Sequence, residues 1–527
     1  MKITPTSVRP SFLFPGGFLL FFALVLGTAA ASESGPKGDL PLSQGTPAEP
    51  IALGNRLELF VDPFLIDTMD GTALKLHTPR DEGPVLTFDR PWEGPVSGYV
   101  TVLFDEGRYR LYYRGGSSSK PGGIQVTCYA ESSDAIHWER PNLGLYEVCG
   151  TRENNVILDG DDELTHNFAP FIDGNPAAPK EERFKALAGG MKGVFAFVSE
   201  DGIHWRKKWD HPVFNQPVSS FDSLNCPFWS ESEGKYLFYF RTYRFDATLG
   251  YEIRSVSRAE STDFEHWGPI DGGEMNFGDT LREHLYTTQT APYYRAPQIY
   301  IATAARLIPT RHVLDAEEKA NLDVLPGVFF DGCSEGVVMT TRGGKRFDRT
   351  FMEGFIRPGL EIGDWVPRGN YPSRGIVPTG IVKEKPARPQ RPYGDLGERE
   401  MSMFARRWYG QKNHSLCRYS MRIDGIASVN APFAGGEFVT KPLTFTGSEL
   451  VLNAATSAEG WMQVEILDEA GFPIPGFSVE DSPLLTGNWL AKPVRWESGK
   501  SVGDLAGKTV RLRFVMRDAD LYSVRFR

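Results

Sequence analysis

The sequence has few cysteines, and none has the paired spacing of redox or zinc sites. Five cysteines occur among 527 residues, so at least one stays outside any intrachain disulfide. No Cys-x-x-Cys pair is present, and a chain of this length can bury a large core without disulfides. We therefore interpret the cysteines as small buried hydrophobic residues, with a Cys128–Cys149 bridge as an open alternative.

Basic runs, phosphate-binding loops and metal motifs are also missing. The chain has 57 Lys and Arg against 67 Asp and Glu, a formal net charge of −10. Without a Lys/Arg block or a Walker pattern, the sequence argues against nucleic acid and nucleotide partners. The nine histidines form no His-Glu-x-x-His or clustered Cys/His motif, so no metal or other cofactor is predicted. A Ca²⁺ held by oxygen ligands alone cannot be read from spacing and stays open.

Residues 1–31 have the features of a cleaved secretory signal. Two basic residues precede an apolar run over 11–27, and three alanines at 29–31 form a small-residue exit. An uncleaved anchor is the alternative, and no later run reaches the roughly 18–20 apolar residues of a spanning helix. The sequence thus predicts a secreted or periplasmic bacterial protein with no membrane partner after cleavage, and a disordered linker over 32–54.

One motif recurs at long intervals: a strand, a Ser-x-Asp turn and then a tryptophan. The complete copies, with spacings of 201 − 134 = 67 and 263 − 201 = 62 residues, contain Asp134, Asp201 and Asp263. Degenerate copies lie at 341–347 and 422–426. Repeats of this length with several strands each are typical of propeller blades. We therefore interpret the Asp and Trp residues as structural parts of the turns.

Composition supports an all-β fold. Gly and Pro together number 55 + 38 = 93, and aromatic residues make up 12%, which suits turns and pleated surfaces. The five copies predict a five-bladed β-propeller over residues 55–430. The pattern then changes to short strands between turns, which predicts a C-terminal β-sandwich over 431–527. A helix is expected only at 316–322, inside an insertion of the fourth blade.

These motifs carry a family likeness. A propeller whose blades end in Ser-x-Asp-x-x-x-Trp, followed by a sandwich, resembles the five-bladed glycoside hydrolase superfamily of invertases, levansucrases and arabinanases. The chain is more closely similar to uncharacterised secreted planctomycete proteins in the segments Leu59–Asp62, Pro91–Glu93, His166–Phe168, Phe221–Ser223, Phe355–Gly359 and Asp518–Ser523. The superfamily resemblance implies catalytic carboxylates on the innermost strands of different blades.

Three carboxylates share a position relative to their blades. Counted back from the aromatic that opens each second strand, Glu93 lies 109 − 93 = 16 residues upstream, Asp222 lies 236 − 222 = 14 and Glu283 lies 300 − 283 = 17. Glycoside hydrolysis needs two such groups, about 5–9.5 Å apart, on either side of one bond. Glu93 departs from the Asp of the superfamily's first blade, whereas Asp62 is out of register. A turn carboxylate, a strand-initiating Asp and a solvated ion cluster are the respective alternatives.

Neutral and basic residues in the same register are candidates for substrate binding. Groups able to form several hydrogen bonds to sugar hydroxyls are His166, Asn167, Asn225 and Gln289. Tyr286 and Trp365 suit stacking on a sugar ring, or belong to the core. Arg368, like Arg357, suits a carboxylate or sulfate on an acidic sugar, or pairs with a channel carboxylate.

The first hypothesis is a secreted glycoside hydrolase that cleaves a polysaccharide or oligosaccharide. Glu93 would act as base or nucleophile, with Asp222 and Glu283 sharing the acid and stabilising roles. A carbohydrate-binding or scaffold propeller without turnover is the second hypothesis. A polysaccharide lyase with His166 or a tyrosine as base is the third.

Overall fold

The computed structural model describes residues 49–116, 125–160, 165–190, 193–215, 221–247, 249–322, 324, 332–380 and 399–527. The predicted signal at 1–31 and most of the predicted linker lie outside these residues. The last four residues of the predicted linker form a strand, β1 (Ile51–Gly54), instead of disordered chain. No helix in the described part of the chain is long and apolar enough to cross a membrane.

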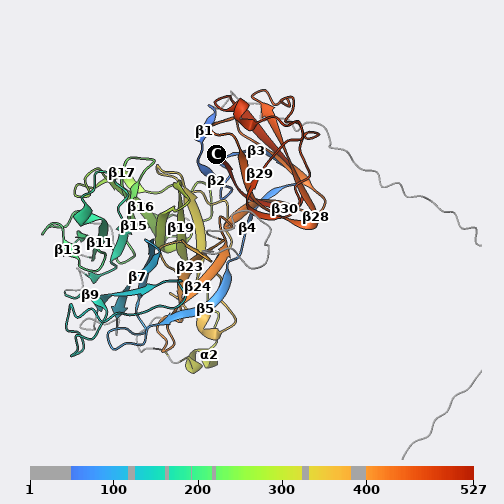
Figure 1. The fold of residues 1–527 in the computed structure, drawn as a ribbon. Helices are drawn as coiled ribbons and strands as arrows, with labels where there is room; N and C mark the ends of the chain where they lie inside the picture. Colours follow the sequence, from blue (N-terminus) through green and yellow to red (C-terminus); the bar gives the residue numbers. More distant parts are fainter. Residues whose placement is uncertain are drawn as a thin grey trace, which may run out of the picture. The chain divides into compact units, whose positions relative to one another are not determined.

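The fold is all-β, and five antiparallel sheets form the blades of a propeller, as predicted (Figure 1). Blade one contains β6 (Gly98–Asp105), β7 (Arg108–Gly116), β8 (Gln125–Ser132) and β9 (Val156–Leu158). Blade two contains β10 (Ala169–Ile172), β11 (Phe184–Gly190), β12 (Gly193–Ser199) and β13 (Arg206–Lys207), with a short 3-10 helix, η1 (Lys180–Glu182). Blade three contains β14 (Cys226–Ser230), β15 (Lys235–Asp246), β16 (Tyr251–Ser261) and β17 (Gly268–Glu274).

The last two blades are less regular, which agrees with their degenerate turn motifs. Blade four contains β18 (His284–Tyr293), β19 (Ala296–Ile308) and β20 (Cys333–Thr341). Blade five contains β21 (Tyr371–Pro372), β22 (Val377–Thr379), β23 (Glu400–Arg407), β24 (Ser415–Arg422) and β5 (Arg80–Thr87). Because β5 precedes blade one in the chain but pairs with β24, the two ends of the propeller segment share one sheet and close the ring.

The repeated Asp turn is structural, as predicted. In the second copy, Asp201 Oδ1 accepts hydrogen bonds of 2.8 Å from the backbone N–H groups of Ile203 and His204. Ser199 Oγ accepts the N–H of Gly202 at 2.9 Å. The copies at Asp134 and Asp263 repeat these contacts.

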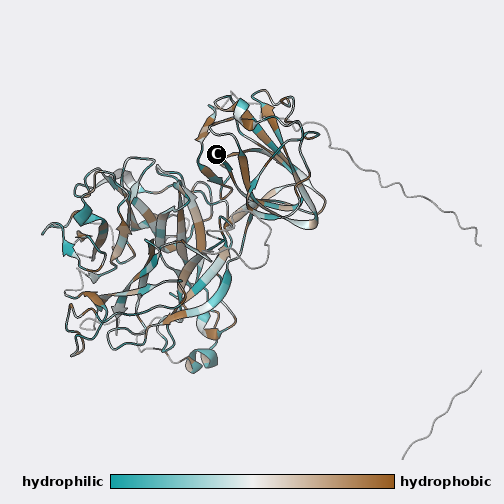
Figure 2. Ribbon diagram, viewed as in Figure 1, coloured by the Kyte–Doolittle hydropathy of each residue, from teal (hydrophilic) through white to brown (hydrophobic). Residues whose placement is uncertain are grey.

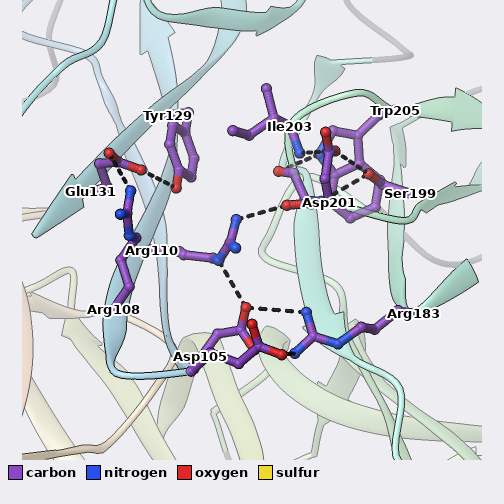
Figure 3. A network of polar contacts seen from close by, with 12 residues as sticks. Asp105, Arg108, Arg110, Tyr129, Glu131, Arg183, Ser199, Asp201, Ile203 and Trp205 are labelled. Atoms are coloured by element: carbon purple, nitrogen blue, oxygen red, sulfur yellow. Dashed lines mark hydrogen bonds and ion pairs between the residues drawn. The ribbon is translucent and has the colours of Figure 1, made fainter. Parts of the chain in front are cut away.

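The turn also joins neighbouring blades, as Figure 3 shows. Arg110 on β7 of blade one donates to the backbone oxygen of Asp201 in blade two at 2.7 Å. The same guanidinium donates to Asp105 at 3.1 Å, and Asp105 also pairs with Arg183 of blade two. Trp205 packs edge-on against Tyr112 of blade one, with ring centroids 6.3 Å apart. The motif therefore fixes the spacing between blades as well as the turn.

A buried arginine fills the centre of the propeller. Arg374 follows β21, is 2% exposed, and donates to the backbone oxygens of Pro170 on β10 and Pro227 on β14. Its own backbone pairs with β6, through Val102 N to Arg374 O at 2.8 Å and Arg374 N to Val100 O at 2.9 Å. Blades one, two, three and five are thus tied together at the axis by one residue.

The second β-domain takes strands from both ends of the chain. Its mixed sheet contains β1, β2 (Leu57–Leu59), β3 (Ile66–Asp70), β4 (Ala73–Leu76), β25 (Ala427–Ala431), β26 (Gly436–Thr440), β27 (Leu443–Phe445), β28 (Leu450–Asp468), β29 (Asn488–Pro493) and β30 (Val510–Phe526). The core includes the stacked pairs Phe438–Phe514 and Phe445–Phe526. Residues 55–76, which we expected in the propeller, pair here with C-terminal strands, a long-range contact that sequence order does not reveal.

Helix and cysteine predictions have clear outcomes. Helix α2 (Ala316–Asn321) matches the expected segment, and a capping box between Asp315 and Glu318 fixes its start. It buries no residue, and Figure 2 shows it as hydrophilic. Short 3-10 helices also occur at η2 (Ile362–Asp364) and η3 (Val502–Leu505). All five cysteines are free; Cys149 is exposed and the other four are buried.

Candidate functional site

Side chains from all five blades meet where the innermost strands begin, around the propeller axis. We call this set the mouth ring; its members are Tyr99, Arg114, His166, Asn167, Asp222, Arg241, Arg254, Tyr286, Arg368, Tyr371, Arg406 and Tyr409. Each member contacts another across a strand or a blade boundary, so the set is continuous. Of the predicted site residues, the ring brings together Asp222, His166, Asn167, Tyr286 and Arg368.

Blades one and two meet through Arg114 at the end of β7. Its guanidinium donates to Asn167 Oδ1 at 3.1 Å and to the backbone oxygen of Val96 at 3.1 Å. The same group stacks over the Tyr99 ring, 4.7 Å from the centroid. These contacts hold Arg114 by hydrogen bonds to neutral oxygens and by a cation–π contact, and none of them neutralises its charge.

Blades two and three meet through His166 and Asp222. His166 Nε2 lies 3.2 Å from Asp222 Oδ1, and His166 Nδ1 lies 3.2 Å from Gln125 Nε2. This geometry suits the tautomer with the proton on Nε2, which donates to the carboxylate while Nδ1 accepts from the amide. Arg241 Nη2 lies 3.6 Å from the other carboxylate oxygen of Asp222.

The environment of Asp222 keeps its carboxylate ionised. Burial of the group opposes ionisation, but the His166 hydrogen bond and the charges of Arg241 and Arg114 outweigh it and lower the pKa of Asp222 below its usual value. The side chain is nevertheless 52% exposed. Asp222 is therefore a charged carboxylate, fixed in direction by a histidine and open to solvent at the mouth.

Blades four and five complete the ring with stacked arginines and tyrosines. Tyr286 on β18 receives Arg241 and Arg254 at 5.2 and 4.7 Å from its centroid, and its ring lies 5.2 Å from that of Tyr371. Arg406 on β23 lies over the ring of Tyr371 at 4.8 Å and also over Tyr99 at 5.2 Å. The contact with Tyr99 returns the ring to blade one.

Backbone strain is concentrated at the same place. Tyr99, Asn167, Arg368 and Asn370 all have positive φ, with values of 51°, 54°, 64° and 55°. A left-handed conformation is costly for a residue as large as Tyr or Arg, and such residues cluster at functional sites. Gly98 permits the close approach of Arg406, because a Cβ at Gly98 would lie 2.2 Å from Nη1 of that arginine.

Several buried polar atoms in and beside the mouth ring have no hydrogen-bond partner among the described residues. They are Asn167 Nδ2, Asn225 Oδ1, Arg254 Nε, Gln289 Oε1, Tyr371 OH and Arg406 Nε. A narrow cavity lined by Tyr99, Gln289, Tyr371 and Arg406 lies between blades one, four and five. Unsatisfied buried groups cost about 1–3 kcal/mol each, so their concentration here indicates a place for a polar ligand or ordered water.

Glu93 lies in a separate buried network on blade one. Tyr113 OH donates to Glu93 Oε1 at 2.5 Å, and Arg140 Nε lies 3.2 Å from the same oxygen. Asn155 donates to the Tyr113 hydroxyl at 2.8 Å. Burial raises the pKa of Glu93, although Arg140 and the Tyr113 hydrogen bond oppose the shift. Its side chain is 0% exposed, so this carboxyl faces the blade interior and not the solvent-open mouth where Asp222 lies.

Glu283 is also held by other partners. It pairs with Arg306 and, at 2.5 Å, with Arg349. A bulge between Leu285 and Thr287 shifts the register of β18, so Tyr286 reaches the ring while Glu283 lies between blades three and four. The structure thus places the three predicted catalytic carboxylates in three different surroundings.

The remaining predicted binding residues lie beside the ring or away from it. Gln289 lines the cavity, and Asn225 is buried with its amide donating to the Phe221 backbone oxygen at 3.2 Å. Trp365 is held outside the ring by its own segment, because its indole N–H donates to the backbone oxygen of Gly359 at 3.0 Å. In the described part of the chain, no group of three or more His, Cys, Asp or Glu could hold a metal ion.

Sequence reasoning missed most of the arginines of the ring. Arg114, Arg241 and Arg254 lie on second and third strands, which the register argument did not search. The available signal was the alternation within Tyr239–Tyr243, where Arg241 shares a face with both tyrosines. Tyr99 and Tyr371 escaped notice for another reason, because aromatic residues open many strands of this chain.

Comparisons with known proteins give matches to solved structures only. No family model matches the chain, and no curated protein matches it. The predicted closeness to planctomycete proteins therefore stays a prediction. Similar structures include a BT0996 RGII complex, with 10% identity, a TM-score of 0.42, and coverage of 65% of this chain and 92% of that one.

Two further matches cover the same share of the chain. A structure described as "Glycoside hydrolase" has 10% identity and a TM-score of 0.43, and covers 66% of this chain and 92% of its own. An N-acetylgalactosamine deacetylase from F. plautii, in complex with blood group B trisaccharide, has 12% identity and a TM-score of 0.41, with coverage of 67% and 96%. At these identities no activity carries over, and the five-bladed fold rests on the sheet topology described above.

Proposed function

We propose that the protein is a secreted or periplasmic carbohydrate-active enzyme whose site is the mouth ring. The observation that carries the proposal is Asp222, a half-exposed carboxylate kept ionised by His166, Arg241 and Arg114. Buried amide and hydroxyl groups with open hydrogen-bonding capacity surround it, and Tyr286 offers an aromatic face. Amides, hydroxyls and an aromatic face are the groups that orient sugars. The predicted N-terminal signal supports the location.

We propose glycoside hydrolysis as the reaction, with Asp222 as base or nucleophile. A lowered pKa keeps the carboxylate charged at neutral pH, which suits attack or deprotonation of water and not proton donation. In hydrolysis a second group must protonate the leaving oxygen while the glycosidic bond breaks. His166 is the neighbouring proton carrier, and Glu93 and Glu283 are the acid candidates from the sequence.

A polysaccharide lyase is the second candidate, favoured by one feature of the ring. Among the ring's residues Asp222 is the only carboxylate, whereas bases of the histidine and tyrosine type are present. In β-elimination on a uronate, His166 would take the proton next to the carboxylate. A C=C bond then forms, the bond to the glycosidic oxygen breaks, and that oxygen receives a proton. The product is unsaturated and absorbs in the ultraviolet.

One experiment separates the candidates. The wild-type protein and Asp222→Asn are incubated with a panel of polysaccharides, and reducing ends and ultraviolet absorbance are recorded. Hydrolysis releases reducing ends without absorbance, while elimination gives both. We expect Asp222→Asn to lower the rate at least 100-fold, the lower range of general acid–base effects. The control is Asp210→Asn, at a fully exposed carboxylate. Equal rates for Asp222→Asn and wild type would contradict the proposal.

A further inference from the structure

The mouth ring carries a concentration of positive charge that a neutral sugar does not require. It contains five arginines and one carboxylate, a formal charge of +4 when His166 is neutral, although the whole chain has a net charge of −10. Within the residues that the structure describes, Arg114, Arg254, Arg368 and Arg406 form no ion pair. Like charges held together are costly unless a counter-charge joins them.

The tyrosines of the ring compensate this charge only in part. Arg114, Arg254 and Arg406 lie over tyrosine faces at 4.7–5.2 Å, and Arg368 lies 5.6 Å from the Tyr409 centroid. Cation–π contacts of this kind fix the plane of a guanidinium but leave its N–H donors at the edge. The stacked arginines are therefore oriented groups with donors that remain available to an oxyanion.

Two buried, unpartnered polar groups point to the position of such an anion. Arg406 is 4% exposed with its Nε unpartnered, and Tyr371 is 2% exposed with its hydroxyl unpartnered. Both line the cavity that also contains Tyr99. A planar guanidinium with a free N–H edge matches the oxygen pairs of a carboxylate or a sulfate.

We infer that the mouth ring binds an oxyanion carried by the carbohydrate, a uronate carboxylate or a sulfate ester, with Arg406 and Arg368 as its principal ligands. This inference rests on the proposed function and specifies its substrate class. Asp222 repels the anion at short range, so the acidic group binds on the side of blades five and one, and the bond to be cleaved lies beside Asp222. The substrate is thus an acidic polysaccharide or oligosaccharide.

The test compares matched acidic and neutral ligands by isothermal titration calorimetry. Oligogalacturonate is paired with its carboxyl-reduced form, and a sulfated oligosaccharide with its desulfated form. We expect each ring arginine to contribute about 10–100-fold to acidic-ligand affinity. Arg368→Gln and Arg406→Gln should lose that factor and leave neutral-ligand affinity unchanged. Arg108→Gln, an exposed arginine that pairs with Glu131, is the control.

The outcomes separate the inference from the proposed function. Preference for oligogalacturonate assigns a carboxylate, and preference for the sulfated ligand assigns a sulfate ester. Equal affinity for acidic and neutral ligands overturns the inference and leaves the proposed function standing. Inorganic sulfate or phosphate that binds as tightly as the acidic sugars overturns the link to carbohydrate. Absence of any sugar binding contradicts both. Arg368→Gln, at a half-buried residue, keeps the test valid if Arg406→Gln fails to fold.

Discussion

His166 Nε2 and Asp222 Oδ1 lie 3.2 Å apart, across the boundary between blades two and three. The hydrogen bond is the largest of the influences that lower the pKa of Asp222. His166→Ala should therefore raise the pKa of Asp222 and move the acid limb of the kcat/KM profile to higher pH.

The pH profile separates this role from a purely structural one. A residue that only packs would change stability and leave the position of the acid limb unchanged. His137→Ala is the matched control, because His137 Nδ1 lies 2.7 Å from Asp134 Oδ2 on an exposed turn away from the ring. An acid limb that stays in place in His166→Ala would contradict the assignment.

The fold was largely predictable because the turn motif is local. Asp134, Asp201 and Asp263 bind their own backbone within three residues, so the motif appears in sequence with a fixed spelling. The long-range pairings carry no such signal. Strand β5 closes blade five, and strands β1 to β4 join C-terminal strands, through backbone hydrogen bonds that any β-rich segment can form.

The candidate site was predictable where the register of the inner strands is uniform. Counting placed Asp222 and Asn167 correctly beside the axis, but it failed to bring Glu283 there because the bulge in β18 shifts the register. Glu93 lies in a turn closed by its N–H bond to the Arg90 oxygen, and its side chain turns onto Tyr113 instead. Single-residue shifts of this kind cannot be read from spacing.

Glu93→Gln should affect stability and not turnover. The carboxyl is buried, and its raised pKa means that folding favours the protonated form. This contribution is present at low pH and is lost as pH rises through the folded pKa, whereas Gln does not titrate. The free energy of unfolding of Glu93→Gln, relative to wild type, should therefore rise between about pH 4 and pH 7 in urea titrations. A turnover loss as large as that of Asp222→Asn would restore Glu93 as a catalytic candidate.

Asp201→Ala should destabilise the propeller by about 1–2 kcal/mol, because it removes a cap for two backbone N–H groups. Hydrogen bonds to the carboxylate overcome the effect of burial and lower the pKa of Asp201 to about 2. The stabilisation is therefore complete above the usual Asp pKa of about 3.9 and is lost as pH falls through 2. Chemical denaturation at several pH values measures it, with Asp210→Ala as the exposed control. A difference that is constant down to low pH would contradict the assignment.

Gly98→Ala tests the close approach between blade one and Arg406. Gly98 has φ of 151°, and an added Cβ would lie 2.2 Å from Arg406 Nη1, so the guanidinium must move from its position over Tyr99. We expect the affinity for acidic ligands to fall about tenfold, the loss of one charged hydrogen bond. Gly107→Ala is the matched control, since Gly107 also has positive φ but nothing within 4 Å of the added Cβ. Both variants carry backbone strain, so melting temperature should fall in both, while affinity should fall only in Gly98→Ala. Equal affinity in the two variants would show that the position of Arg406 does not govern binding.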